Sequence, residues 1–277
     1  MNLSHFIPKG IKRVLKRVYY FRYWEKRKRE YANKKNITEG REYAFMEKLK
    51  TGLDTIPIFI ISYNRLSYME NIYRWLKDYK IKNKVIIIDN HSSYEPLLSW
   101  YKTIDWEVVY LDRNYGHMAF WNSHRFDDYR KDFYIVTDPD IEPVNNCPSN
   151  FIQIWFDLLL KYPGIKKAGF SLKIDDLPDT ALKGTIIDHE KNYYLRYIPS
   201  DRAYVAEIDT TMALYVPDHL DRSKSFLSAM RSGEPYAAKH LPWYKSLEMV
   251  TEEDLFYEST KKNGWWNIVD EKVHKGN

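Results

Sequence analysis

The 277-residue sequence predicts an α/β fold with a mostly parallel sheet and helices on both faces, preceded by a basic helical extension. Between residues 57 and 162, short apolar runs alternate with helix-length segments, which is typical of βαβ units. Residues 1–50 contain 15 Lys and Arg against 5 Asp and Glu, whereas the remaining 227 residues carry a net charge of −5. We therefore expect a basic extension at 1–50 and an α/β domain at 51–277.

Composition excludes several other classes. The 24 Tyr, 12 Phe and 9 Trp are core-forming residues, so the chain is not disordered. The single cysteine, Cys147, excludes a disulfide framework and fits a reducing compartment. No apolar run reaches the roughly 18 residues of a membrane-spanning helix. We also expect no secretory signal, because the apolar stretches of residues 1–30 are too short.

The basic extension predicts two helices. From Ile11 to Glu39 there is no Gly or Pro, and apolar residues recur at helical spacing with Lys and Arg between them. A second helix is expected at 41–50, and Thr51-Gly52 marks the boundary. A basic amphipathic helix is typical of segments that lie on anionic membranes, so we expect residues 1–35 to bind such a surface. Packing on the body or on a second subunit of a homo-oligomer is the alternative.

The domain begins with a regular alternation of elements. Apolar runs predict buried strands, and helical periodicity or length predicts the helices between them. The expected order is strand 57–61, helix 66–79, strand 84–89, helix 94–101, strand 107–111, helix 117–129, strand 133–137 and helix 151–162. Shorter β-like pieces at 167–174, 204–208 and 211–216 then precede a last helix at 252–262.

Polar residues follow all four of the first strands. These strand ends are 62–65, 89–93, 112–114 and 138–140, and three of them begin with Asp. In an open parallel sheet, ligands bind at the carboxyl ends of the strands. Asp138 and Asp140 are two apart on a turn, so both can reach one hard divalent cation. Pairs of this kind also occur by chance, and the weight of this one comes from its place after a strongly apolar strand.

The four strand ends resemble the nucleotide-sugar half of GT-A-type, family 2-like glycosyltransferases. Residues 58–65 resemble the first strand and turn of that family, and 87–93 resemble its second strand. Residues 113–116 resemble the loop after the third strand, and 136–143 resemble the metal-binding Asp-x-Asp turn. The resemblance covers 57–143. It implies a Rossmann-like GT-A domain with its nucleotide-sugar half at 51–143 and its acceptor half at 144–277.

The resemblance also implies an activity. Such an enzyme moves a sugar from a nucleoside-diphosphate sugar to a glycan or lipid-linked acceptor, in bacterial surface polysaccharide synthesis and with inversion. Its place would be the cytoplasm, peripheral on the inner face of the membrane. The cofactor would be Mn²⁺ or Mg²⁺, held by Asp140 and Asp138 with His240 from a C-terminal loop. An ordinary loop histidine is the alternative for His240. The implied nucleotide-sugar contacts are Tyr63, Asn64, Arg65, Asp89, Arg113, Asn114 and Asp138.

An inverting transferase needs a carboxylate that takes the proton of the acceptor hydroxyl. Glu253-Asp254 is the closest match to the Glu-Asp pair of the family, with Asp254 in the catalytic place; a one-residue shift nominates Glu253. The alternative is a helix N-terminus, because Thr251 followed by acids is also an N-cap sequence. Acceptor candidates are Trp121, Asp209, Trp243 and Tyr244, whose alternatives are core packing for the rings and an ordinary turn for Asp209.

Three other functions compete with this interpretation. A haloacid-dehalogenase-like phosphotransferase also has a strand followed by Asp-x-Asp, but it requires Thr or Val where Glu142 stands. A nucleotide-binding Rossmann enzyme requires a Gly-rich loop, and residues 62–65 contain no Gly. A non-catalytic module that binds nucleic acid or membranes explains the basic extension. Nucleic acid is not expected as a partner, because it leaves the acidic strand ends unexplained.

Overall fold

The computed structural model describes residues 35–261 of a chain that divides into two compact units, 1–50 and 51–277. In the first unit, the helix expected at 41–50 is confirmed as part of α2 (Lys35–Thr51). The amphipathic helix expected from Ile11 lies outside the described residues. Within 35–261, no helix is both long and apolar enough to cross a membrane.

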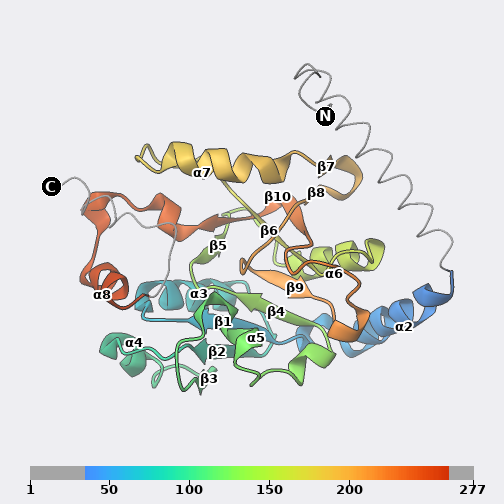
Figure 1. Cartoon of the computed structure of the whole chain (residues 1–277), viewed down its shortest axis with the longest axis horizontal. Helices are drawn as coiled ribbons and strands as arrows, with labels where there is room; N and C mark the ends of the chain where they lie inside the picture. Colours follow the sequence, from blue (N-terminus) through green and yellow to red (C-terminus); the bar gives the residue numbers. More distant parts are fainter. Residues whose placement is uncertain (1–34, 262–277) are drawn as a thin grey trace, which may run out of the picture. The chain divides into compact units, whose positions relative to one another are not determined.

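The second unit is built on a sheet that has ten strands within the described residues. In Figure 1 the strands follow one another from β3 at the bottom to β7 and β8 near the top, in the order β3-β2-β1-β4-β9-β6-β10-β8-β7, while β5 pairs with β10. Their bounds are β1 (Ile58–Ser62), β2 (Val85–Asp89), β3 (Glu107–Tyr110), β4 (Tyr134–Thr137), β5 (Ile141–Pro143), β6 (Lys167–Leu172), β7 (Tyr197–Ile198), β8 (Ala203–Val205), β9 (Ala213–Tyr215) and β10 (Ala229–His240).

The α/β class with a parallel block is confirmed. Strands β3, β2, β1 and β4 are parallel neighbours, and β6 and β10 are parallel to each other. β9 lies antiparallel between β4 and β6, and β8 is antiparallel to β10. The first four strands therefore all end at one edge of the sheet, where ligands bind in open α/β sheets.

The buried strands form where apolar, β-branched residues run without interruption. β1 and β2 are buried along their whole length, in a register from Ile58↔Val85 to Ser62↔Asp89. A strand covered on both faces requires apolar residues at consecutive positions rather than at alternate ones. The register places Asp89 level with Ser62 at the carboxyl ends of the two strands.

Helices and loops cover both faces of the sheet. On one face, Phe59 of β1 packs against Phe120 of α5, with ring centroids 4.7 Å apart. On the other, Phe170 of β6 packs against Trp155 of α6 at 4.6 Å. The helices are α3 (Leu66–Asp78), α4 (Glu95–Trp100), α5 (Ala119–Asn122), α6 (Phe151–Lys161), α7 (Lys183–Glu190) and α8 (Glu252–Thr260).

Two expectations about elements were wrong. The helix expected at 117–129 stops after Asn122, because His124 adopts a left-handed backbone with φ of 56° that ends the helix. The second half, expected to consist of short β-like pieces, contains the helix α7 and the twelve-residue strand β10. A register shift between Ser232 and Ala237 interrupts β10, so its side chains do not alternate regularly.

Candidate functional site at the carboxyl edge of the sheet

The loops after β1 and β2 are joined by one buried amide. Asn64 is fully buried and has a left-handed backbone with φ of 51°. Its Oδ1 accepts hydrogen bonds from the backbone N–H groups of Ser93 (2.8 Å) and Tyr94 (3.0 Å), and its Nδ2 donates to Thr260 Oγ1 (3.0 Å). Tyr63 beside it donates through its hydroxyl to the Thr260 carbonyl at 2.8 Å. Asn64 thus links the loops after β1 and β2 to Thr260, and both polar atoms of its side-chain amide already have hydrogen-bond partners.

A second amide joins the loops after β2 and β3. Asn90 Oδ1 accepts from the Tyr115 N–H (2.8 Å), and its Nδ2 donates to Asn114 Oδ1 and to the Gly116 carbonyl, both at 3.0 Å. Asn90 carries no sequence signal of its own, because an Asn that follows a strand-end Asp looks like an ordinary loop residue. Arg113, which precedes Asn114, is exposed.

Asp89 is buried at the end of β2 with 2% of its surface exposed. Its Oδ1 accepts from the Ser92 N–H at 2.9 Å. Its Oδ2 is buried without a hydrogen-bond donor among the described residues. A buried carboxylate oxygen without a donor is costly, so Asp89 is a candidate for contact with a ligand hydroxyl.

The Asp-x-Asp turn gives its two carboxylates different partners. Asp138 Oδ2 accepts from Thr210 Oγ1 at 2.5 Å, across 72 positions of sequence. Asp140 Oδ2 lies 3.3 Å from His240 Nε2 at the end of β10. The structure therefore brings His240 to Asp140, while Asp138 pairs with Thr210. Thr210 directly follows Asp209, the residue nominated from this turn, and is a further member of the site.

Burial and neighbouring charges separate the pKa values of the two carboxyl groups. Burial, followed by the negative charge of Asp140, raises the pKa of Asp138 well above its usual range. Burial also acts to raise the pKa of Asp140, but the charge and hydrogen bond of His240, together with Arg65, hold it below its usual value. The pKa values of the two carboxyl groups are therefore shifted in opposite directions.

The donor set at this turn fits a cation that arrives with a ligand. No cluster of three or more His, Cys, Asp and Glu placed to hold a metal ion occurs within residues 35–261. Asp140 Oδ1 and His240 Nδ1 are buried and have no hydrogen-bond partner in that range. Mg²⁺ in phosphate-binding sites takes one or two protein carboxylates and completes its shell with phosphate oxygens and water. Asp140 with His240 fits this arrangement, and an all-protein cage does not.

The two acids nominated as the base are both held by other groups. Asp254 Oδ1 accepts from Arg65 and from Lys245 (2.8 Å), while its Oδ2 accepts from the Thr251 N–H (2.9 Å) in a capping box at the start of α8. Burial opposes the charge of Asp254, but the hydrogen bonds from Lys245, Thr251 and Arg65 hold its pKa well below the usual range. Such a carboxylate is a weak proton acceptor, so the geometry favours the capping alternative.

Glu253 stabilises a different helix. Its Oε1 accepts from Ser67 Oγ (2.6 Å) and its Oε2 from the Ser67 N–H (2.9 Å). Ser67 lies in the first turn of α3, where backbone N–H groups lack partners within the helix. Glu253 therefore fixes α8 against the N-terminus of α3, immediately after the β1 strand end.

The expected acceptor residues do not form one cleft. Trp121 is 8% exposed and packs in the core against Phe226, and Trp243 is 4% exposed, so core packing accounts for both rings. Tyr244 donates to Asp176 Oδ1 at 2.5 Å. Asp209 has an exposed side chain, while its carbonyl faces inward.

A pocket of about 420 Å³ lies instead between β6, β10 and the segment around β7 and β8. Three tyrosines line it, and the rings of Tyr194 and Tyr197 each lie 4.9 Å from that of Tyr204. Lys173 and Glu234 add charge at its wall and pair at 2.9 Å. This pocket could not be predicted from the sequence, because its tyrosines come from segments that carry no recognisable motif.

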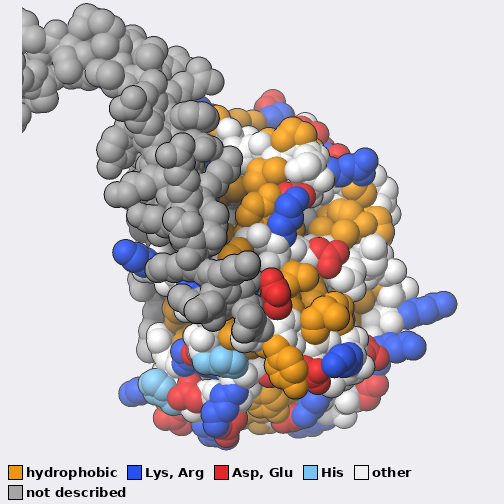
Figure 2. Space-filling model, turned by 90° about the vertical axis from the view of Figure 1, so that its right-hand side faces the viewer, with side chains coloured by type: hydrophobic (Ala, Val, Ile, Leu, Met, Phe, Trp, Pro, Cys, Tyr) orange, Lys and Arg blue, Asp and Glu red, His pale blue; other side chains and the backbone are white. Residues whose placement is uncertain are grey.

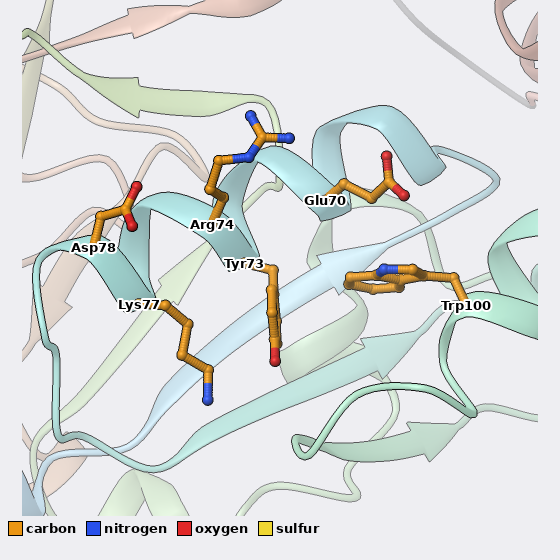
Figure 3. A pocket seen from close by; sticks show the side chains of 6 residues that line it. All are labelled: Glu70, Tyr73, Arg74, Lys77, Asp78 and Trp100. Atoms are coloured by element: carbon orange, nitrogen blue, oxygen red, sulfur yellow. The ribbon is translucent and has the colours of Figure 1, made fainter.

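A second hollow of about 420 Å³ lies along the side of α3 (Figure 3). Figure 3 shows the rings of Tyr73 and Trp100 side by side, and their planes meet at 84°. Its six lining residues include none of the predicted site residues. The hollow is therefore separate from the carboxyl edge of the sheet.

Among comparisons with known proteins, only the one with solved structures found a similar protein. No protein-family model matches the sequence, and no curated protein matches it. Among solved structures, the chain is similar to glucosyl-3-phosphoglycerate synthase from Mycobacterium tuberculosis in complex with phosphoglyceric acid, at 13% identity and a TM-score of 0.35. The match covers 59% of this chain and 57% of that one, which is less than two thirds of either. A likeness at this level carries no argument about activity.

Proposed function

We propose that the protein is a glycosyltransferase that uses a nucleoside-diphosphate sugar as donor and requires Mn²⁺ or Mg²⁺. The observation that carries the proposal is the Asp-x-Asp turn at the carboxyl edge of a parallel block, where Asp140 faces His240 and Asp138 is held by Thr210. The order of the strand-end motifs, which resembles family 2-like enzymes, supports it. The metal supplies positive charge that stabilises the departing nucleoside diphosphate.

The residues of this chain have separate roles in the proposal. Asp140 and His240 hold the metal, because His240 Nε2 faces Asp140 Oδ2 at 3.3 Å and Asp140 Oδ1 has no partner among residues 35–261. Asp89 takes a donor hydroxyl through its free Oδ2. Asp138, oriented by Thr210, contacts the donor beside the metal. Tyr63, Asn64, Arg65, Arg113 and Asn114 act by shaping the loops around the donor.

The tyrosine-lined pocket is the proposed place of a glycan acceptor, reached either from solution or on a lipid carrier. Ala237 at its wall is three residues from His240 along β10, or about 10 Å at the usual rise of a strand. Aromatic rings cover the apolar faces of sugars. Tyr197→Ala should therefore raise KM for the acceptor while leaving donor hydrolysis unchanged; a change in donor hydrolysis would exclude this role.

The test of the main proposal is metal-dependent binding of a nucleoside diphosphate. UDP, GDP and dTDP are added to the full chain with and without MnCl₂, and thermal unfolding is followed. A ligand present at 100 times its Kd stabilises the folded state by about 2.7 kcal/mol. We expect a stabilisation that needs Mn²⁺, disappears in Asp140→Asn and persists in the control Asp105→Asn, whose carboxylate is exposed and pairs with Lys77.

Three outcomes would contradict the proposal. One is stabilisation that does not depend on metal, and another is equal stabilisation of Asp140→Asn and the control. The third is stabilisation by oligonucleotides alone.

The face in Figure 2 shows basic, acidic and apolar side chains interspersed, an arrangement unlike the continuous basic surface that binds nucleic acid.

We further propose that residues 1–35 place the enzyme on the inner, anionic surface of the cytoplasmic membrane. The support is the sequence, with 10 Lys and Arg and one acid in residues 1–29. Co-sedimentation with vesicles tests this proposal. Binding should require anionic lipid, weaken with salt and vanish when residues 1–35 are deleted. Unfolding or dissociation of an oligomer on deletion would assign the segment a structural role instead.

A further inference from the structure

Lys167 is a fully buried lysine without an acidic partner. It lies in β6 with none of its surface exposed, and no carboxylate of residues 35–261 is within ion-pair distance of it. Its Nζ donates to the Asp209 carbonyl (2.7 Å) and to the Tyr215 hydroxyl (3.1 Å), and it lies 3.7 Å from the centre of the Phe226 ring. The three donors of the ammonium group thus face a carbonyl, a phenol and an aromatic face.

A buried ammonium of this kind has an energetic cost. Burial lowers the pKa of Lys167 to about 7, which reflects how poorly this site solvates the charge. A Met or Leu would fill the same space beside Phe226 without that cost. The presence of a lysine here is therefore best explained by its hydrogen bond to the backbone of the turn before β9.

That turn is fixed at two adjacent residues. Lys167 holds the carbonyl of Asp209, and Thr210, which is 5% exposed, donates its hydroxyl to Asp138 Oδ2 at 2.5 Å. Consecutive residues share a planar peptide unit, so fixing the Asp209 carbonyl also restricts where the Thr210 side chain can lie. Without Lys167, the Asp209 carbonyl would keep only the longer hydrogen bond from the Tyr215 hydroxyl (3.5 Å), and the turn would be held less firmly.

We propose that Lys167 is a positioning residue, which sets the Asp138 carboxylate for donor binding through the turn at Asp209 and Thr210. This inference rests on the proposed function, because it takes Asp138 to contact the donor. Lys167 touches neither donor nor metal. It acts from inside the sheet, across the antiparallel pairing of β6 with β9.

The test compares Lys167→Met, which keeps the length and removes the donors, with Lys166→Met. Lys166 is the adjacent residue, and its ammonium pairs with Asp221 at 2.5 Å rather than with the turn at Asp209. Hydrogen exchange of peptides that span 206–212 is measured without ligand. We expect faster exchange there in Lys167→Met and wild-type exchange in Lys166→Met. Unchanged exchange in Lys167→Met would overturn the inference, whatever the activity of the protein.

Binding then tests the consequence for the donor. The Kd of the stabilising nucleoside diphosphate with MnCl₂ should rise roughly tenfold in Lys167→Met and in Thr210→Val, as for loss of one orienting hydrogen bond. The double variant should be no weaker than either single one, because both act through the same turn. Additive losses, or a wild-type Kd in Lys167→Met, would refute the coupling.

Other measurements decide the inference if the wild-type chain binds no nucleoside diphosphate or if Lys167→Met does not fold. If the wild-type chain binds no nucleoside diphosphate, the proposed function fails, while the exchange experiment still decides whether Lys167 fixes the turn. If Lys167→Met does not fold, Tyr215→Phe removes the phenol oxygen, which accepts from Lys167 Nζ and also donates to the Asp209 carbonyl at 3.5 Å. Loss of these two bonds should then change the same exchange and binding measurements, and no change would overturn the inference.

Discussion

Replacing Asp254 by Asn should destabilise the fold far more than its small change in shape suggests. The Asp254 side chain is 5% exposed, and Lys245 and Arg65 both donate to it. Asn keeps one oxygen for the Thr251 N–H, but it removes the negative charge between two cations. Breaking a buried ion pair by removing one partner costs about 3–5 kcal/mol, and we expect about 2–4 kcal/mol here because part of the cap survives.

The sign of the pH dependence follows from the lowered pKa of Asp254. A carboxyl group with a depressed pKa in the folded state contributes stability above its unfolded pKa of about 3.9 and loses it as the pH falls toward the folded value. The difference in unfolding free energy between wild type and Asp254→Asn should therefore be full at pH 7. It should begin to shrink below about pH 5 and continue to do so at more acidic pH.

Urea unfolding at pH 7, 5 and 3.5 measures this difference. The matched control is Asp105→Asn, which breaks an exposed pair with Lys77 and should cost no more than about 1 kcal/mol. A cost below about 0.5 kcal/mol for Asp254→Asn at pH 7 would refute the reasoning, as would a difference that grows in acid.

The same variant tests whether Asp254 is the base. Donor hydrolysis and transfer are measured per folded molecule at a temperature well below the unfolding midpoint. A purely structural role leaves transfer within a few-fold of wild type, whereas loss of a general base lowers it by about 10²–10⁴. The hydrogen bonds to both carboxylate oxygens favour the first outcome.

Two further predictions concern stability and reactivity. Glu190→Gln leaves the charge of the buried Arg231 guanidinium without the carboxylate that now pairs with it at 2.6 Å, so it should cost about 3–5 kcal/mol in urea unfolding. The double variant Glu190→Leu with Arg231→Met should recover part of this loss, and a cost below about 1 kcal/mol for Glu190→Gln alone would contradict the prediction. Burial raises the pKa of the Cys147 thiol to about 12, so it should react with DTNB at pH 8 only after unfolding in urea, and rapid reaction of the native protein would contradict the burial.

Much of the fold could be predicted, because the first half of the domain has local signals that agree with its tertiary structure. Continuous apolar runs gave β1, β2 and β4, and their polar ends meet at one edge. The strand β10 was not predicted, since Gly233 and Pro235 divide it and its register shifts between Ser232 and Ala237. The end of α5 was placed too late, because nothing in the local periodicity signals the left-handed His124.

The residues of the candidate site, like the strands, could be predicted only where a local sequence signal marks them. Asp138 and Asp140 are identifiable from their place after a strand, and His240 was nominated from a C-terminal loop. The contacts of Thr210 and Lys167 could not be predicted, because their partners lie 72 and 42 positions away in the sequence. Such partners carry no local pattern, because only the pairing of β9 with β4 and β6 brings them to the turn.

The acids at the start of α8 show why a motif alone does not assign a role. A Thr followed by acidic residues is favoured at a helix N-terminus for physical reasons unrelated to catalysis. The same residues lie where a family 2-like enzyme carries its base, so sequence supports both roles equally. The structure separates them through the partners of each oxygen. Asp254 and Glu253 accept donors on both oxygens, whereas Asp89 and Asp140 each keep one buried oxygen without a donor in residues 35–261. Ligand contact is therefore better assigned to the second pair.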